Sequence, residues 1–294
     1  MKAVFIGCVD MSYILLERLL ELNDIKIVGV ITREESRFNS DFRSLEPLAI
    51  SARIPCFKTK DNCDKEMSAW VRGVSPDVVF CCGWSWLLKG EMLSIPKKGV
   101  IGFHPALLPK NRGRHPIVWA LALGMRETGS TFFFVDAHVD SGDIVSQHKI
   151  IISDTDDAET LYTKIKDVAV EQIKEVALGL ANGTLKRYPQ NAAEATVLRK
   201  RSKKDGKINW ALPVSEVYNL VRALARPYIG AHCFYNDQEF KVWKAKPFMV
   251  NATKVTPGKV LNVEGNKITI QCADGALTLL DHEIKNLPVV GDIL

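Results

Sequence analysis

The chain has 294 residues, of which 47% are hydrophobic and 25% charged. This composition is that of a soluble globular protein with one large domain or two smaller ones. No apolar run reaches the length needed to cross a bilayer. The net charge of +5 permits an anionic substrate, but it is too small to indicate nucleic acid by itself. Seven scattered cysteines without a C-x-x-C pair indicate reduced thiols in a cytoplasmic protein.

The first part of the chain alternates apolar, β-rich runs with amphipathic stretches, and it starts directly with such a run, so we expect no signal peptide. We predict strands over 2–7, 25–31, 77–83 and 99–103, and helices over 11–22, 42–53 and 65–72. This alternation predicts an α/β fold with a Rossmann-like, mostly parallel sheet that carries helices on both faces. Ligands of such sheets bind at the carboxyl ends of the strands.

The middle of the chain predicts a hairpin of strands over 130–135 and 144–152, followed by a helix over 155–180. A polar, basic stretch then suits a linker. After a helix over 214–225, short strands separated by Gly, Asn and Asp turns predict a small barrel or sandwich from residue 231 onward. We therefore expect three parts, which are a catalytic domain over 1–187, a linker over 188–204 and a C-terminal domain over 205–294.

Two segments carry side chains that could take part in catalysis. FHPALLPKNRGRHP (103–116) ends a strand in a Pro-rich turn with an imidazole, His104, at the end of the strand, and VDAHVDSGDIV (135–145) offers Asp140. An imidazole and a carboxylate on neighbouring strand-end loops can form a proton-transfer site. A lone histidine in a turn more often only hydrogen-bonds that turn, and Asp136 and Asp143 on the second loop suit turn formation. The residues alone leave these alternatives open.

Longer stretches around these residues resemble the folate-dependent formyltransferase family. They are FHPALLPKNRGRHPIVWAL, ETGSTFFFVDAHVDSGDIVSQ, LRKRSKKDGKINW and VYNLVRALARPYIGAHCFY, in this order along the chain. The resemblance implies an N-terminal domain that binds 10-formyltetrahydrofolate without a metal, and an OB-like β-barrel as C-terminal domain. Methionyl-tRNA formyltransferases and the formyltransferase domain that acts on UDP-4-amino-arabinose share this C-terminal domain. The family spacing, with Gly142 two residues after the carboxylate, selects His104 and Asp140 as the catalytic pair.

Formyl transfer to an amine needs a neutral amine, a stabilised oxyanion and a path for protons, and a His–Asp pair can move the protons. The family usually places Asn two residues before the histidine, where this chain has Gly102. Either a water, a backbone N–H or another side chain such as Asn111 holds the formyl oxygen, or the enzyme is slow or inactive. Asn111 also suits a turn. We expect Gly102→Asn to be tolerated or activating. Phe133, where many relatives carry His, is expected to pack.

The resemblance also assigns binding residues on both sides of the pair. The folate side comprises Gly83, Trp84, Ser85, Trp86, Leu87, Leu88 and Val139, and the substrate side comprises Gly102, Pro105, Asn111, Arg112, Gly113 and Arg114. Apolar walls suit a flat pterin, although both tryptophans could instead pack in a core. A guanidinium suits phosphate or carboxylate, although Arg112 could instead hydrogen-bond its own loop.

The choice of acceptor rests on charge. tRNA formyltransferases typically carry a basic insertion after the second strand, whereas TREESRFNSDFRSLEP (32–47) is short and of mixed charge. A protein that grips tRNA should show a stronger positive field, and the basic run over 199–204 also suits a solvated linker. We predict formyl transfer to a nucleotide-linked amino sugar, a UDP-4-amino-4,6-dideoxy sugar of a surface-glycan pathway. We expect a cytoplasmic enzyme with no membrane or nucleic-acid partner and allow for a homodimer. The alternatives are a methionyl-tRNA formyltransferase, a formyltetrahydrofolate hydrolase and a non-catalytic binder.

Overall fold

The computed structural model describes residues 1–35, 40–60, 63–249 and 256–294. The chain forms two compact units. Unit 1 comprises Met1–Pro116, Thr128–Ile150 and Thr163–Leu198, and unit 2 comprises Ile117–Glu127, Ile151–Tyr162 and Arg199–Leu294. Each unit therefore draws on several separate stretches of sequence, unlike the linear domains 1–187 and 205–294 that the sequence predicts. Residues 36–39, part of the 32–47 segment used to choose the acceptor, lie outside the described residues.

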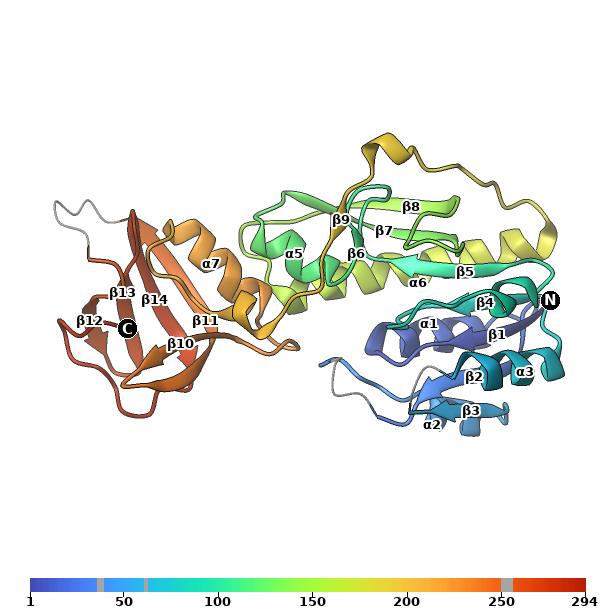
Figure 1. Cartoon of the computed structure of the whole chain (residues 1–294), viewed down its shortest axis with the longest axis horizontal. Coiled ribbons are helices and arrows are strands. Elements are labelled where there is room, and N and C mark those ends of the chain that lie inside the picture. The colour runs from blue at the N-terminus through green and yellow to red at the C-terminus, as the bar shows by residue number, and fades with distance from the viewer. Residues whose placement is uncertain (36–39, 61–62, 250–255) are drawn as a thin grey trace. The chain divides into compact units, whose positions relative to one another are not determined.

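A seven-stranded sheet in the order β3-β2-β1-β4-β5-β7-β8 forms the centre of unit 1 (Figure 1). Its strands are β1 (Lys2–Ile6), β2 (Lys26–Arg33), β3 (Cys56–Thr59), β4 (Val78–Cys81), β5 (Val100–His104), β7 (Glu127–Phe134) and β8 (Ile144–Ile151). The strands β1 to β5 run parallel to their neighbours, and β7 pairs antiparallel with β5. The predicted mostly parallel sheet is confirmed. The sequence analysis missed β3, a four-residue strand with one lysine and no apolar run.

Helices cover both faces of this sheet. They are α1 (Asp10–Leu20), α2 (Glu46–Ser51), α3 (Asp64–Val74), α4 (Glu91–Ser94) and α6 (Ala158–Asn182), whereas α5 (Pro116–Ala122) belongs almost entirely to unit 2. On one face, Val4 and Ile6 of β1 pack with Met67 and Val71 of α3. Side chains alternate along a strand, so the fully buried Phe5 points to the opposite face. This double burial explains why the parallel strands are continuous apolar runs.

Unit 2 carries an antiparallel sheet in the order β10-β11-β14-β13-β12. Its strands are β10 (Ala231–Tyr235), β11 (Gln238–Met249), β12 (Val260–Glu264), β13 (Lys267–Gln271) and β14 (Gly275–His282). Helix α7 (Val214–Ala223) buries Val214, Val217 and Val221, which lie on one side of the helix. The predicted C-terminal β-domain is confirmed, and five antiparallel strands match the strand count of an OB fold.

The segment predicted as a linker is held in place by contacts. Its strand β9 (Val197–Leu198) pairs with β6 (Arg112–Gly113) in the loop that follows His104. The basic run begins at Arg199, within unit 2. The guanidinium carbons of Arg199 and Arg201 lie 5.1 and 4.5 Å from the ring centroid of Trp119. These two cations of the basic run therefore contact an aromatic ring of their own unit.

All seven cysteines have free thiols. Burial raises the pKa of Cys233 to about 12, so this thiol stays protonated and unreactive near neutral pH. In the part of the chain that the structure describes, each helix is too short or too polar to span a bilayer.

Candidate active site

His104 is the last residue of β5, at the carboxyl edge of the sheet, and only 5% of its surface is exposed. Its Nε2 lies 2.7 Å from the backbone carbonyl oxygen of Asn111. A carbonyl oxygen can only accept a hydrogen bond, so Nε2 carries the hydrogen of the neutral ring. The remaining nitrogen, Nδ1, is therefore the one that can take up a proton.

Asp140 lies in the connection between β7 and β8 and faces this nitrogen. Its Oδ2 is 3.6 Å from His104 Nδ1 and accepts a hydrogen bond of 2.8 Å from the backbone N–H of Gly113. The separation exceeds a hydrogen bond, so the carboxylate acts on the ring as a nearby charge. The backbone of Asp140 has a left-handed φ of 51°, a conformation that Asp and Asn adopt more readily than most residues. The structure thus brings together the two side chains that the sequence analysis selected.

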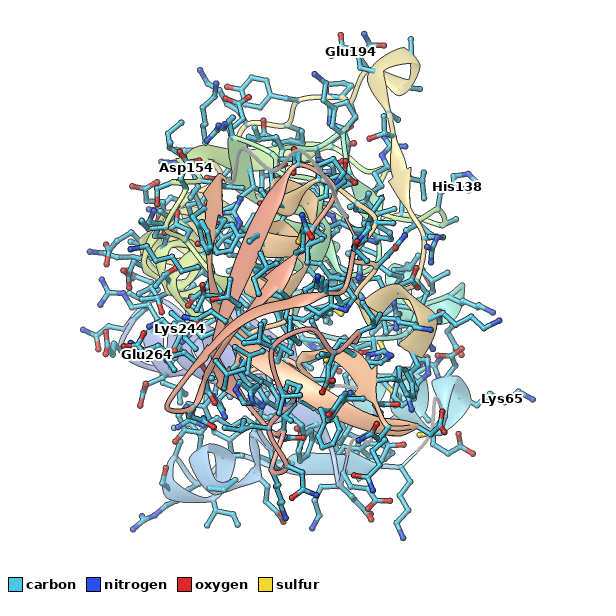
Figure 2. All side chains as sticks on the ribbon, turned by 90° about the vertical axis from the view of Figure 1, so that its left-hand side faces the viewer. Lys65, His138, Asp154, Glu194, Lys244 and Glu264 are labelled. Atoms are coloured by element: carbon cyan, nitrogen blue, oxygen red, sulfur yellow. The ribbon has the colours of Figure 1, made fainter. Side chains whose placement is uncertain are left out.

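The other polar residues of this loop have separate roles. Asp136 accepts hydrogen bonds from the Ser141 hydroxyl, at 2.7 and 2.9 Å, and from the backbone N–H of His138. This is the turn-forming role that the sequence analysis proposed for Asp136. His138 is exposed, and its side chain points outward at the surface (Figure 2). His104 is therefore the imidazole that faces Asp140.

Gly102, two residues before His104, has no free space beside it. It pairs with Phe133 across the β5–β7 ladder. A Cβ atom at Gly102 would lie 2.8 Å from Val135 Cγ2 and 2.9 Å from Phe133 Cζ. The ring of Phe133 thus fills the place that a side chain at position 102 would need. The expectation that Gly102→Asn is tolerated or activating does not fit this packing.

We therefore expect Gly102→Asn to destabilise the protein by about 1–3 kcal/mol, because overpacking a filled core displaces neighbouring side chains. Thermal unfolding measures the effect. Gly73→Asn is a matched control, because no atom lies within 4 Å of a Cβ at Gly73. In a Phe133→Ala background the same change at Gly102 should cost less, because the ring is gone. An unchanged melting temperature with equal or higher turnover would contradict this prediction.

The predicted folate loop, residues 83–88, follows β4 directly. The rings of Trp84 and Trp86 meet edge to face with centroids 5.3 Å apart, and the Arg33 guanidinium carbon lies 4.2 Å from the Trp86 ring centroid. Trp84 packs against the buried core cluster that includes Leu88. These two residues therefore form part of the core, as the packing alternative proposed.

The exposed part of the predicted folate side consists of Leu87 and Val139, which are 47% and 41% exposed. Trp84 contributes one further feature. Its Nε1 is buried and has no hydrogen-bond partner among the residues that the structure describes. The exposed apolar side chains suit a flat heterocycle.

The predicted substrate side is a hydrogen-bonded loop. Arg114 Nη1 donates to the backbone oxygen of Ser85 at 2.5 Å, which ties this loop to the folate loop. Arg112 donates to Gln190 Oε1 through Nε and Nη2, at 3.1 and 2.7 Å. Both guanidinium groups thus bond to protein atoms, which favours a structural role for each.

The remaining members of that side shape the turn. The carbonyl oxygen of Pro105 accepts from the Thr128 hydroxyl at 3.3 Å. Asn111 has a left-handed φ of 61°, as a turn-forming Asn does. It contacts His104 through its backbone oxygen. The sequence analysis missed Gln190 and Thr196, since neither carries a motif that distinguishes it from other polar residues in a linker.

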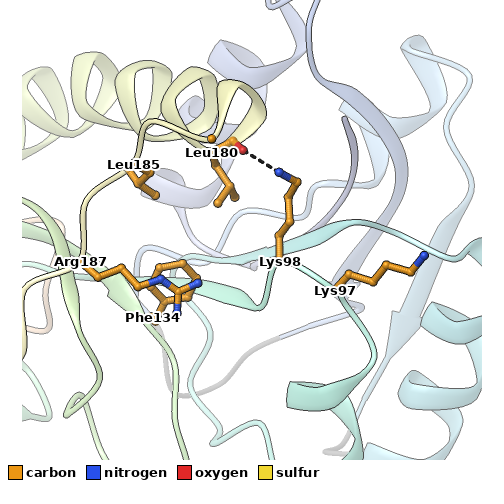
Figure 3. Close-up of a pocket in the computed structure, with 7 residues that line it drawn as sticks. Lys97, Lys98, Phe134, Leu180, Leu185 and Arg187 are labelled. Atoms are coloured by element: carbon orange, nitrogen blue, oxygen red, sulfur yellow. Dashed lines mark hydrogen bonds between the residues drawn. The ribbon is translucent and has the colours of Figure 1, made fainter.

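A separate cavity of about 230 Å³ lies away from this site (Figure 3). It is lined by Lys97, Lys98, Phe134, Leu180, Gly183, Leu185 and Arg187. Lys98 Nζ donates to the backbone oxygen of Leu180 at 2.9 Å, and the Arg187 guanidinium stacks on the Phe134 ring. Lys97 and Lys98 precede β5, whereas His104 ends it. The cavity is therefore distinct from the His104 site.

A mostly parallel α/β sheet with a buried imidazole and a facing carboxylate at its carboxyl edge is an arrangement that suits proton transfer. The family model of formyl transferases matches residues 2–177, and the model of the formyl transferase C-terminal domain matches residues 200–289. The chain belongs to the formyl transferase family.

Solved structures share this fold. WlaRD, a sugar 3N-formyl transferase crystallised in the presence of dTDP and 5-N-formyl-THF, is 20% identical with a TM-score of 0.69, over 95% of this chain and 96% of that one. An N-formyltransferase from Helicobacter canadensis in complex with folinic acid and dTDP-3-aminofucose is 18% identical with a TM-score of 0.72, over 96% and 100%. HypX from Aquifex aeolicus, in complex with tetrahydrofolic acid, is 18% identical with a TM-score of 0.67. The match covers 95% of this chain and 43% of the HypX chain.

Proposed function

We propose that the protein is an N-formyltransferase that moves the formyl group of 10-formyltetrahydrofolate to the amine of a nucleotide-linked amino sugar. The observation that carries this proposal is the facing pair, His104 Nδ1 and Asp140 Oδ2, 3.6 Å apart at the carboxyl edge of the sheet. Membership of the formyl transferase family supports the reaction type. The nucleotide or nucleotide sugar in two structures of the same fold supports the acceptor class.

The proton transfers follow from the ring contacts. His104 Nδ1 takes the proton that the amine loses as its nitrogen bonds to the formyl carbon, because Nε2–H is already bound to the Asn111 carbonyl. Asp140 stabilises the resulting imidazolium by its charge. His104 then returns the proton to the donor nitrogen as the bond between that nitrogen and the formyl carbon breaks. Gly102 supplies no side-chain donor, so a backbone N–H, a water or the protonated ring would stabilise the oxyanion.

The donor would bind along residues 83–88 and Val139. Trp86, Leu87 and Val139 supply apolar contacts for the pterin, and the loop backbone can bond its polar edge. Arg114 links this loop to the one that follows His104. The folate supplies the formyl group, and these residues would hold that group beside Nδ1.

The proposal also concerns which nucleotide and which amino sugar form the acceptor. Sequence reasoning favours a UDP-4-amino-4,6-dideoxy sugar, whereas the two nucleotide-bound structures contain dTDP or a dTDP sugar. We also propose a cytoplasmic location, which suits seven free thiols. A homodimer remains a prediction.

One assay tests the function and its alternatives together. The protein is incubated with 10-formyltetrahydrofolate and a panel of UDP-, dTDP- and CMP-linked amino sugars, with charged initiator tRNA in parallel. Mass spectrometry then detects the gain of one formyl group. Product on a sugar nucleotide supports the proposal, whereas product on tRNA alone establishes the tRNA alternative. Formate release without an acceptor would identify a hydrolase, and folate binding without turnover a non-catalytic binder.

A further inference from the structure

Residues 188–198, which we call the strap, run from the end of the sheet to the loop after His104. Tyr188 pairs with Ile144 at the start of β8 through two backbone hydrogen bonds, of 2.8 and 2.9 Å. At the other end, β9 pairs with β6. Figure 1 shows this segment returning from α6, past β8, to β9 beside β6. Main-chain contacts at both ends therefore hold the strap in place independently of its side chains.

Gln190 of the strap bonds to both loops that carry the catalytic pair. Its Nε2 donates to the backbone oxygens of Asp140 and Gly142, at 3.0 and 2.7 Å. Its Oε1 accepts both bonds from Arg112, at 3.1 and 2.7 Å. Both amide hydrogens and both lone pairs of this one side chain are thus used. Four bonds from a single amide fix the distance between the two loops.

These two loops set the geometry of the catalytic pair. On one side, the backbone of Asp140 bonds to Gln190, and its carboxylate bonds to Gly113 N–H. On the other side, the Asn111 carbonyl holds His104 Nε2. The strap reaches this side too, because the Thr196 hydroxyl accepts from Asn111 N–H at 2.8 Å. The strap thus bonds both to the Asp140 loop and to the loop that holds His104.

We infer that Gln190 is a positioning residue, which keeps Asp140 at its distance from His104 by bonding the Asp140 loop to the Arg112 loop. This inference rests on the proposed catalytic role of the pair. Asp140 adopts a left-handed backbone, and the contacts of its loop help to hold this conformation. Without the amide, the Asp140 loop loses two of these contacts. A misplacement of about 1 Å at a reacting group can cost about 10²-fold in rate.

The test compares two replacements of Gln190. Gln190→Met keeps the shape and removes all four bonds. Gln190→Glu keeps the acceptor for Arg112 but removes both donated bonds and places a carboxylate against two carbonyl oxygens. We expect each variant to lower kcat by about 10–100-fold, with the KM for the folate within about threefold of the parent value.

Two matched controls separate positioning from general stability. Gln172→Met removes bonds to the Ser130 carbonyl and the Ser146 hydroxyl in the same unit. Glu194→Gln changes a strap side chain that points outward (Figure 2). Both should keep the parent kcat. An unchanged kcat in Gln190→Met would overturn the inference, as would an equal loss of kcat in Gln172→Met at equal loss of thermal stability.

Two further measurements address the route of the effect. If Gln190 acts through Asp140, Gln190→Met should cost little more in kcat when Asp140 is already replaced by Asn; full additivity would contradict this route. The backbone amide of Gly113 provides a readout without turnover, because its N–H bonds to the Asp140 carboxylate. Gln190→Met should accelerate hydrogen exchange of this amide by about tenfold. If exchange of the Gly113 amide is unchanged in Gln190→Met, the inference is overturned, whether or not any formyl acceptor has been found. If exchange is faster but the parent protein formylates no acceptor, the result counts only against the proposed function.

Discussion

His104→Ala is expected to lower formyl transfer by about 10²–10⁴-fold, the range for removal of a general acid–base group. The ring is the group whose Nδ1 faces Asp140, and it is buried. Binding of the folate should persist, because residues 83–88 and Val139 do not depend on the ring. Single-turnover rates and quenching of tryptophan fluorescence by the folate measure the two quantities.

The control for this prediction is His138→Ala, which removes an exposed imidazole two residues before Asp140. The hydrogen bond that His138 donates to Asp136 comes from its backbone, so the turn is retained. His104→Gln adds a variant that retains a side-chain N–H for the Asn111 carbonyl and so limits the loss of stability. Turnover close to that of the parent in both His104 variants would remove the proposed base.

Asp140→Asn is expected to lower turnover by about 10²-fold or more. Asn tolerates the left-handed backbone at this position, and an amide oxygen can still accept from Gly113 N–H. The variant therefore preserves the loop and removes only the charge that stabilises the imidazolium. Asp140→Ala would mix this loss with strain in the backbone, so the amide is the cleaner change.

Steady-state kinetics of Asp140→Asn should show a lower kcat with little change in either KM, because the charge acts only once the ring is protonated. Asp136→Asn on the same loop is the control. Its carboxylate bonds to Ser141 and to the His138 N–H, so its replacement should affect the loop's stability more than the rate. Parental rates in Asp140→Asn would exclude Asp140 from the site.

The sequence alone predicted the parts of this site that follow from local pattern. His104 follows a strong apolar run, and the end of such a run in a parallel sheet marks the edge where ligands bind. The choice of Asp140 over Asp136 and Asp143 rested on the family resemblance. The sequence could not show which tryptophan of residues 83–88 packs in the core and which could line a pocket. The packing of Trp84 against the core depends on strands and helices distant in sequence.

Two features of the site lay beyond sequence reasoning for a physical reason. The space beside Gly102 is filled by Phe133 because β7 pairs with β5 in one register, and no local pattern encodes that register. Gln190 bonds to Arg112, 78 residues before it, from a segment whose polar composition is typical of a linker. Polar side chains form such long-range bonds without leaving a periodic signal in the sequence.

The strap has a consequence for truncation of this protein. A fragment that stops at residue 187, the predicted end of the catalytic domain, would lack Gln190 and the β9 strand that pairs with β6. Its two catalytic loops would lack both the Gln190 side-chain amide that bonds them to each other and the pairing of β6 with β9. The smallest fragment with a complete set of these loop contacts must extend through Leu198, which lies beyond the predicted end of the catalytic domain at residue 187.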